Sequence, residues 1–163
     1  MSTQLQQRID QFLYRNAELC DAQDWDAYLD MFSEDSEYHV PQWESEHVYT
    51  TDPKRGMSLI YYANRTGLED RVFRIRTGKA ASTIPMPRTQ HNIANVRICE
   101  LEGGDLEVRA NWHTLFYRLA TSEDFYGHAT YDLKPHGDSW LIQRKHVLLL
   151  NDTINSVLDF YHL

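Results

Sequence analysis

The chain of 163 residues is 42% hydrophobic and 12% aromatic, and it carries a formal net charge of −8 at pH 7. This length supports one hydrophobic core and is short for two, so we expect a single domain over residues 1–163. The negative charge disfavours nucleic acid and anionic membranes as partners, and because the sequence has no signal peptide and no run of roughly 20 apolar residues, we expect a cytoplasmic protein.

The first part of the chain predicts two helices. Apolar residues recur at helical spacing over about residues 3–20, which indicates an amphipathic helix. Asp24 is placed to cap a second, shorter helix. The aromatic-rich face of that helix repeats at i, i+3, i+4 and i+7: Trp25, Tyr28, Leu29 and Phe32. Both faces are typical of ordinary core contacts.

The following segment predicts irregular structure between short elements. Residues 37–40 lie before Pro41 and predict a short strand. The polar, turn-rich residues 42–55 predict an exposed loop or arm. Residues 58–64 favour one or two helical turns that end before Gly67.

A basic block marks the predicted helix at residues 68–75. Arg71, Arg74 and Arg76 lie on the side opposite its apolar residues, in a chain that is acidic overall. Two interpretations remain open: a solvated face with local ion pairs, or a docking surface for an acidic partner.

Residues 80–88 predict a crossover, because Pro85 and Pro87 fit neither a helix interior nor a central strand. Residues 91–101 predict a long strand. Its apolar side chains change face midway, which indicates a β-bulge near Asn95.

Three further strands are predicted at residues 105–119, 124–134 and 139–150, with turns between them. If Phe116 lies near Phe125, the apolar side chains of all three strands share one face. That face would hold Leu106, Val108, Ala110, Trp112, Thr114, Phe116, Phe125, Gly127, Ala129, Tyr131, Leu133, Trp140, Ile142 and Leu148. The same register points two polar residues inward, Arg144 and His146. We therefore expect Arg144 to have an acidic partner or to open onto a pocket.

Apolar residues at helical spacing over residues 154–161 predict a last short helix that docks on its own sheet or on another subunit. Helices first and a curved antiparallel sheet afterwards define an α+β fold, in which the long strands wrap around the N-terminal helices as a cone.

Motifs for catalysis or metal binding are scarce. The two cysteines lack CxxC or CxH spacing, and the eight histidines form no HExxH motif. A stand-alone enzyme of the dehydratase or isomerase kind remains the alternative hypothesis, with His146 as general base and Arg144 and Tyr131 holding a substrate in the cone. We favour a cone filled by its own aromatic side chains, including Trp112.

Several stretches together resemble one known family. They are residues 58–62 (SLIYY), 67–77 (GLEDRVFRIRT), 88–96 (RTQHNIANV), 111–114 (NWHT) and the closing residues 151–163. In these stretches the chain resembles the small (beta) subunit of Rieske non-haem iron aromatic-ring dioxygenases, in the benzoate and anthranilate 1,2-dioxygenase branch.

The resemblance implies a cone like that of nuclear transport factor 2, used as a structural subunit without catalytic residues or cofactors. It implies a hexamer of three large and three small subunits, with the Rieske 2Fe-2S cluster and a mononuclear iron in the large (alpha) subunit. A separate reductase would supply electrons from NADH for dihydroxylation by O2. The residues agree that this chain lacks the CxH and CxxH ligands of a Rieske cluster.

We expect subunit contacts at or near the basic residues that stand out in the sequence. These are Arg71, Arg74, Arg76, Arg88 and His91. The sequence does not identify the aromatic acid that serves as substrate.

Overall fold

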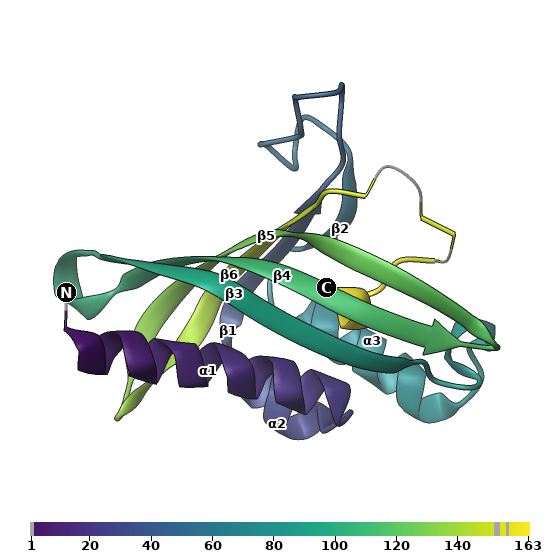
Figure 1. Cartoon of the computed structure of the whole chain (residues 1–163), viewed down its shortest axis with the longest axis horizontal. Helices are drawn as coiled ribbons and strands as arrows, with labels where there is room; N and C mark the ends of the chain where they lie inside the picture. Colours follow the sequence, from purple (N-terminus) through teal and green to yellow (C-terminus); the bar gives the residue numbers. More distant parts are fainter. Residues whose placement is uncertain (1, 152–153, 156) are drawn as a thin grey trace.

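A strongly curved sheet of six strands wraps around the N-terminal helices in the computed structural model (Figure 1). The structure describes residues 2–151, 154, 155 and 157–163. The helices are α1 (Thr3–Asp21), α2 (Trp25–Asp30) and α3 (Thr66–Thr77), with 3-10 turns at Ala81–Thr83, Glu102–Gly104 and Phe160–His162. The strands are β1 (Phe32–Pro41), β2 (Ser58–Tyr62), β3 (Arg88–Glu100), β4 (Leu106–Arg118), β5 (Thr121–His136) and β6 (Ser139–Leu149).

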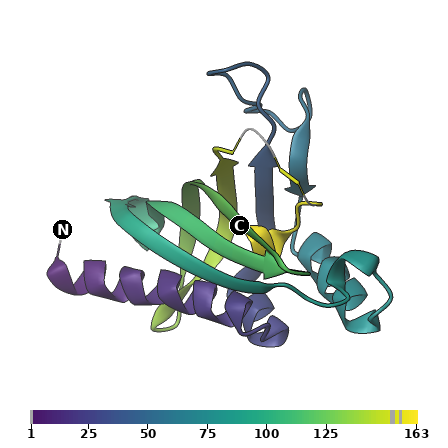
Figure 2. The same cartoon turned by 45° about the vertical axis from the view of Figure 1, so that its right-hand side comes forward.

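The strand order is β2-β1-β6-β5-β4-β3. All neighbouring strands are antiparallel except β1 and β6, which run parallel. The predicted cone of α+β class is therefore confirmed, and the expectation of a wholly antiparallel sheet is wrong at one pair. Figure 2 shows α1 lying across the concave side of the sheet, while the segment between β1 and β2 projects away from it.

The predicted helix starts are confirmed by their caps. Ser2 begins α1 by accepting a hydrogen bond from the Leu5 backbone N–H at 3.0 Å. Asp24 begins α2 by accepting from the Ala27 backbone N–H at 3.4 Å. The apolar face of α1 is buried against the sheet, so this helix is held on the inner side of the cone.

Two predicted elements have a different structure. Residues 58–62 form the edge strand β2 rather than helical turns, and Tyr62 pairs with Tyr38 of β1. The last predicted helix is not formed. The described residues between β6 and residue 160 adopt no helical conformation, and only the 3-10 turn Phe160–His162 follows them. Residues 152, 153 and 156 of that prediction lie outside the described part of the chain.

The β4–β5 hairpin has the predicted register. Thr114 pairs with Phe125, and the rings of Phe116 and Phe125 meet edge to face with centroids 5.6 Å apart. The predicted bulge in β3 is also confirmed, since the pairing shifts between Ala94 and Arg97 and Asn95 has a positive φ of 55°.

An unpredicted bulge in β6 exchanges the inward and outward side-chain positions in the second half of that strand. Leu133 pairs with Ile142, but the adjacent Asp132 pairs with Arg144, so Gln143 is an extra residue. Beyond it the inward positions are Lys145, Val147 and Leu149, all buried. The prediction that Arg144 and His146 face inward is therefore wrong, as is that for Leu148. All three lie on the convex face.

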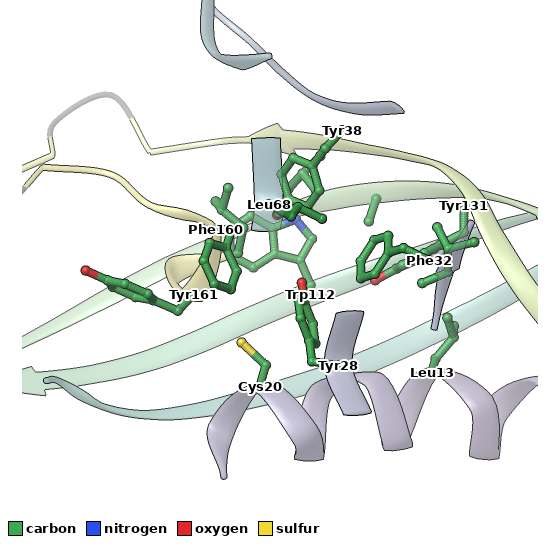
Figure 3. Packing of buried hydrophobic residues seen from close by; sticks show 14 of the residues in the cluster. Leu13, Cys20, Tyr28, Phe32, Tyr38, Leu68, Trp112, Tyr131, Phe160 and Tyr161 are labelled. Carbon is green, nitrogen blue, oxygen red and sulfur yellow. The ribbon is translucent and has the colours of Figure 1, made fainter. Parts of the chain in front are cut away.

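The cone interior is filled, as predicted. Aromatic side chains from the helices and the sheet interlock there, among them Tyr28, Trp112 and Tyr131 (Figure 3). The cavity that Tyr28, Trp112 and Tyr131 border has a volume of about 10 Å³, which is room for about one water molecule. Gly127 permits the close approach of β5 and β6, because a Cβ atom there would lie 1.8 Å from the carbonyl oxygen of Leu148.

Candidate functional site

A buried lysine is the main polar group of the cone interior. The bulge in β6 places Lys145 there with 4% of its surface exposed. Its Nζ lies 5.5 Å from the ring centroids of both Tyr38 and Tyr131. Among the described residues it forms no ion pair. Burial lowers the pKa of its ammonium group to about 8.

The groups around Lys145 are held in their neutral forms. It shares the small cavity with Asn16, Cys20 and Tyr28. Burial raises the pKa of the Cys20 thiol to about 12, and it raises the pKa of Tyr28 well above its ordinary value. The hydroxyl of Tyr28 has no hydrogen-bond partner in the described structure. The lining of this cavity thus combines a cation with neutral hydroxyl and thiol groups.

The three residues of the stand-alone enzyme hypothesis do not converge. Tyr131 is 3% exposed inside the cone. Arg144 and His146 lie across the sheet from it, on the convex face. The expected acidic partner of Arg144 is present, since its Nε lies 3.1 Å from Oε1 of Glu37. With the substrate-binding tyrosine and the proposed base on opposite faces, this catalytic arrangement is not formed.

A histidine pair lies on the convex face beneath the projecting segment. The rings of His39 and His146 lie edge to face with centroids 5.2 Å apart. His39 is fully buried, and its Nε2 lies 2.9 Å from the hydroxyl of Ser58. Tyr49 of the projecting segment covers His146, at 6.2 Å between ring centroids. Burial, and next the charge of Arg144, lower the pKa of His146 to about 4. Both rings are therefore neutral near pH 7.

Local ion pairs account for part of the basic block on α3. Arg71 forms a salt bridge with the buried carboxylate of Asp159. Arg76 pairs with the exposed Asp26 at 2.9 Å. Arg74 is exposed and forms no ion pair with the residues that the structure describes. The block is therefore divided between intramolecular pairing and a free guanidinium.

Arg88 and His91, the two other residues expected near subunit contacts, differ in their exposure to solvent. The guanidinium of Arg88 lies 5.2 Å from the Tyr117 ring centroid, on the convex face. The side chain of His91 is 4% exposed, and its Nδ1 lies 2.5 Å from Oδ1 of Asp21. Its Nε2 lies 3.1 Å from an oxygen of Leu163. His91 therefore organises contacts within the chain, while Arg88 is available at the surface.

Sequence reasoning missed His39, Lys145 and the role of the last residues. Residues 159–163 are all buried, and their rings pack between α2 and the β4–β5 hairpin, at the end of the cone that we call its mouth. Within the described residues, no cluster of three or more His, Cys, Asp and Glu side chains has a metal-binding arrangement. No helix in the same part of the chain has the length and apolarity that crossing a membrane requires.

Comparison with known sequences gives matches along nearly the whole chain. A family model described as "Ring hydroxylating beta subunit" matches residues 15–156. The anthranilate 1,2-dioxygenase small subunit of Acinetobacter baylyi is 59% identical over 163 residues, covering 100% of both chains. The benzoate 1,2-dioxygenase subunit beta of the same organism is 40% identical over 157 residues, covering 96% of this chain and 93% of that one.

Solved structures agree on the fold. The beta subunit of the benzoate 1,2-dioxygenase from Burkholderia mallei matches with a TM-score of 0.80 and 42% identity, covering 95% of each chain. A chain of naphthalene 1,2-dioxygenase gives 0.82 at 21% identity, covering 99% of this chain and 86% of that one. An NTF2-like protein from Novosphingobium aromaticivorans gives 0.61 at 16% identity, covering 95% and 89%. The last two show the fold alone, and they confirm the predicted cone.

Proposed function

Because the chain belongs to the family of ring hydroxylating beta subunits, we propose that it is the small subunit of a multicomponent dioxygenase that dihydroxylates an aromatic carboxylic acid. The observation that carries this proposal is the 59% identity to an anthranilate 1,2-dioxygenase small subunit over the full length of both chains. Anthranilate is therefore the first substrate to test, followed by benzoate.

The proposed role of this chain is assembly rather than chemistry. The packed interior supports this role, because its enclosed space of about 10 Å³ admits no aromatic acid. The separation of Tyr131 from Arg144 and His146 supports it as well, since the stand-alone enzyme hypothesis needs them together.

The partner in this proposal is the large oxygenase subunit, in a hexamer of three large and three small subunits. The Rieske 2Fe-2S cluster and the mononuclear iron would be held by that subunit, and a reductase would deliver electrons from NADH. The cluster would supply electron transfer and the mononuclear iron the activation of O2, while this chain supplies shape and contact surface.

We propose that the contact surface includes those of the five residues expected near subunit contacts that are exposed and have no carboxylate partner. Arg74 on α3 and Arg88 on β3 meet this condition among the described residues. Arg88 lines a surface groove of about 360 Å³ with Leu115 and Tyr117. Both of those side chains are 41% exposed, so the groove combines a cation with apolar surface, as protein interfaces often do.

The test is coexpression of this chain with a tagged anthranilate dioxygenase large subunit. We expect copurification at an equal ratio, a native mass equal to three copies of each subunit, and anthranilate-dependent O2 uptake once the reductase and NADH are added. The chain purified alone should not turn over anthranilate. A chain that stays apart from the large subunit, or that acts on anthranilate unaided, would contradict the proposal.

A further inference from the structure

The last described residues pack into the cone as separate side chains from a short segment, which we call the tail (residues 159–163). Phe160 lies 5.3 Å from Trp25 and 5.6 Å from Tyr28 between ring centroids. Figure 3 shows Phe160 entering the aromatic cluster from a chain segment that is not part of the sheet, with Tyr161 next to it pointing the other way. Every residue of the tail is at most 4% exposed.

His162 fills the other side of the mouth. Its ring stacks on Phe116 with centroids 4.7 Å apart and an interplanar angle of 14°. It meets Phe125 edge to face at 4.9 Å. The tail therefore places aromatic rings against both the helices and the β4–β5 hairpin. Between them it closes the mouth of the cone.

The backbone of the tail contributes little to this docking. Among the described residues its backbone–backbone hydrogen bonds stay within the segment: His162 N–H donates to the Asp159 carbonyl at 3.0 Å, and Leu163 N–H donates to the Phe160 carbonyl at 3.2 Å. The Asp159 side chain accepts from the Phe160 N–H at 2.8 Å. In the described chain the tail thus forms no backbone–backbone hydrogen bond with the rest of the protein, and contacts that involve side chains hold it in place.

A polar anchor holds each end of the tail. At one end, the guanidinium of Arg71 donates from Nε and Nη2 to the two carboxylate oxygens of Asp159. At the other end, Nε2 of His91 contacts the oxygen of Leu163, while Asp21 fixes the His91 ring. Bidentate arginine–carboxylate pairing of this kind gives orientation as well as attraction.

The tail also covers the buried lysine. Leu163 lines the same small cavity as Lys145 and Cys20, so the docked tail separates both groups from solvent. Detachment of the tail would open that cavity at the mouth of the cone, while the sheet and α1 keep their own backbone hydrogen bonds.

We propose that the mouth of the cone is a peptide-binding site whose ligand is the tail of the same chain, and that the tail detaches as a unit without unfolding of the sheet. Openings of this sort occur where a segment has side-chain contacts but no backbone ladder to its surroundings. The proposal is independent of the proposed enzyme assembly, because it concerns contacts within this chain.

Cys20 reports detachment in the full-length chain. In a Cys99→Ser background, which removes the exposed thiol, the rate of Cys20 modification by a thiol reagent is measured with increasing urea. Tail opening exposes little surface, so we expect a labelling rate with a shallow urea dependence, well above the rate that global unfolding allows. Labelling that follows global unfolding at every urea concentration overturns the proposal.

Anchor variants assign the opening to the tail. Arg71→Met and Asp159→Asn should each raise the labelling rate by about tenfold, and the double variant by no more than either alone, because both remove one interaction. Arg74→Met, on the same helix, is the matched control and should change the rate by less than about twofold. If an anchor variant does not fold, the urea dependence of Cys20 labelling in the Cys99→Ser chain still tests the proposal. Equal rates in the Arg71 and Arg74 variants also overturn the proposal.

Discussion

The ammonium of Lys145 lies 5.5 Å from the centroid of the Tyr38 ring, inside the cone. This relationship exists because the bulge at Gln143 shifts the inward positions of β6 by one residue. Without the bulge, Arg144 would occupy the interior and Lys145 the convex face. The interior therefore contains a cation whose solvation is replaced mainly by the faces of two tyrosine rings.

Replacement of Lys145 by methionine should stabilise the chain by about 1–3 kcal/mol at pH 7. Lowering the pKa from 10.5 to about 8 corresponds to about 3–4 kcal/mol at roughly 1.4 kcal/mol per unit, and the loss of cation–π contacts reduces this gain to the stated range. Urea unfolding at pH 7 measures the change. Lys134→Met, at an exposed position of β5, is the control and should be close to neutral.

The same substitution should remove a pH dependence. Between pH 8 and 10.5 the unfolded chain binds more protons at Lys145 than the folded chain does, so Lys145 contributes a rise of stability with pH in that window. Above pH 9 the raised pKa of Cys20 acts in the opposite direction, so the effect is measured as the difference between the wild type and the variant. Below pH 8 Lys145 is charged in both the folded and the unfolded chain, so the full free-energy cost of burying its charge applies. An identical rise in the Lys145→Met variant would show that another group is responsible.

The long helix and the β4–β5 hairpin could be predicted because their apolar patterns are long and fit only one arrangement of side chains. The spacing in α1 covers several turns, and the apolar alternation of β4 continues into β5 in a single register. Residues 58–62 are too few for such a pattern, so only pairing with β1 identifies them as a strand. The docking of the tail depends on tertiary contacts, which spacing alone does not encode.

The inward position of Lys145 was missed for a specific reason. Ile142 and the pair Val147 and Leu149 have opposite parity along β6, so they share one face only if an extra residue lies between them. That conflict in parity was the available signal for a bulge. The apolar Leu148 obscured it, because it fits the regular register that also turns His146 inward.

Gly127→Ala should destabilise the chain by about 2 kcal/mol or more, because the new methyl group meets backbone rather than a mobile side chain. Its Cβ would lie 1.8 Å from the Leu148 carbonyl oxygen, so β5 and β6 must move apart locally. Thermal and urea unfolding measure the loss. His128→Ala at the neighbouring exposed position serves as control, and equal stability of the two variants would be inconsistent with the close strand approach.

His146 should make the chain acid-sensitive. Its pKa is lowered from 6.5 to about 4 in the folded chain, so the unfolded chain binds more protons between these values and stability should fall as the pH drops through this window. Allowing for its partial exposure, we expect a loss of about 1–2 kcal/mol that His146→Gln abolishes. His162, whose pKa is also lowered to about 4, should leave part of the slope in the variant.

Urea unfolding at pH 7 and pH 4.5 tests this expectation. His136→Gln, at an exposed position, provides the control and should keep the full slope of the wild type. Partial loss of the slope in the His136 variant, with none in the His146 variant, would assign the acid sensitivity to a different part of the sheet.

Charge reversal at Arg74 and Arg88 should weaken assembly with the large subunit while leaving this chain folded. Both guanidinium groups are without a carboxylate partner in the described structure, so reversal disrupts no internal ion pair. Reversal of an interface charge typically changes association by about tenfold or more, with strong dependence on salt. Arg97→Glu, at an exposed position of β3, is the control. Native mass measurements at low and moderate salt separate the outcomes, and a hexamer mass that both Arg74→Glu and Arg88→Glu leave unchanged would place the contact surface elsewhere.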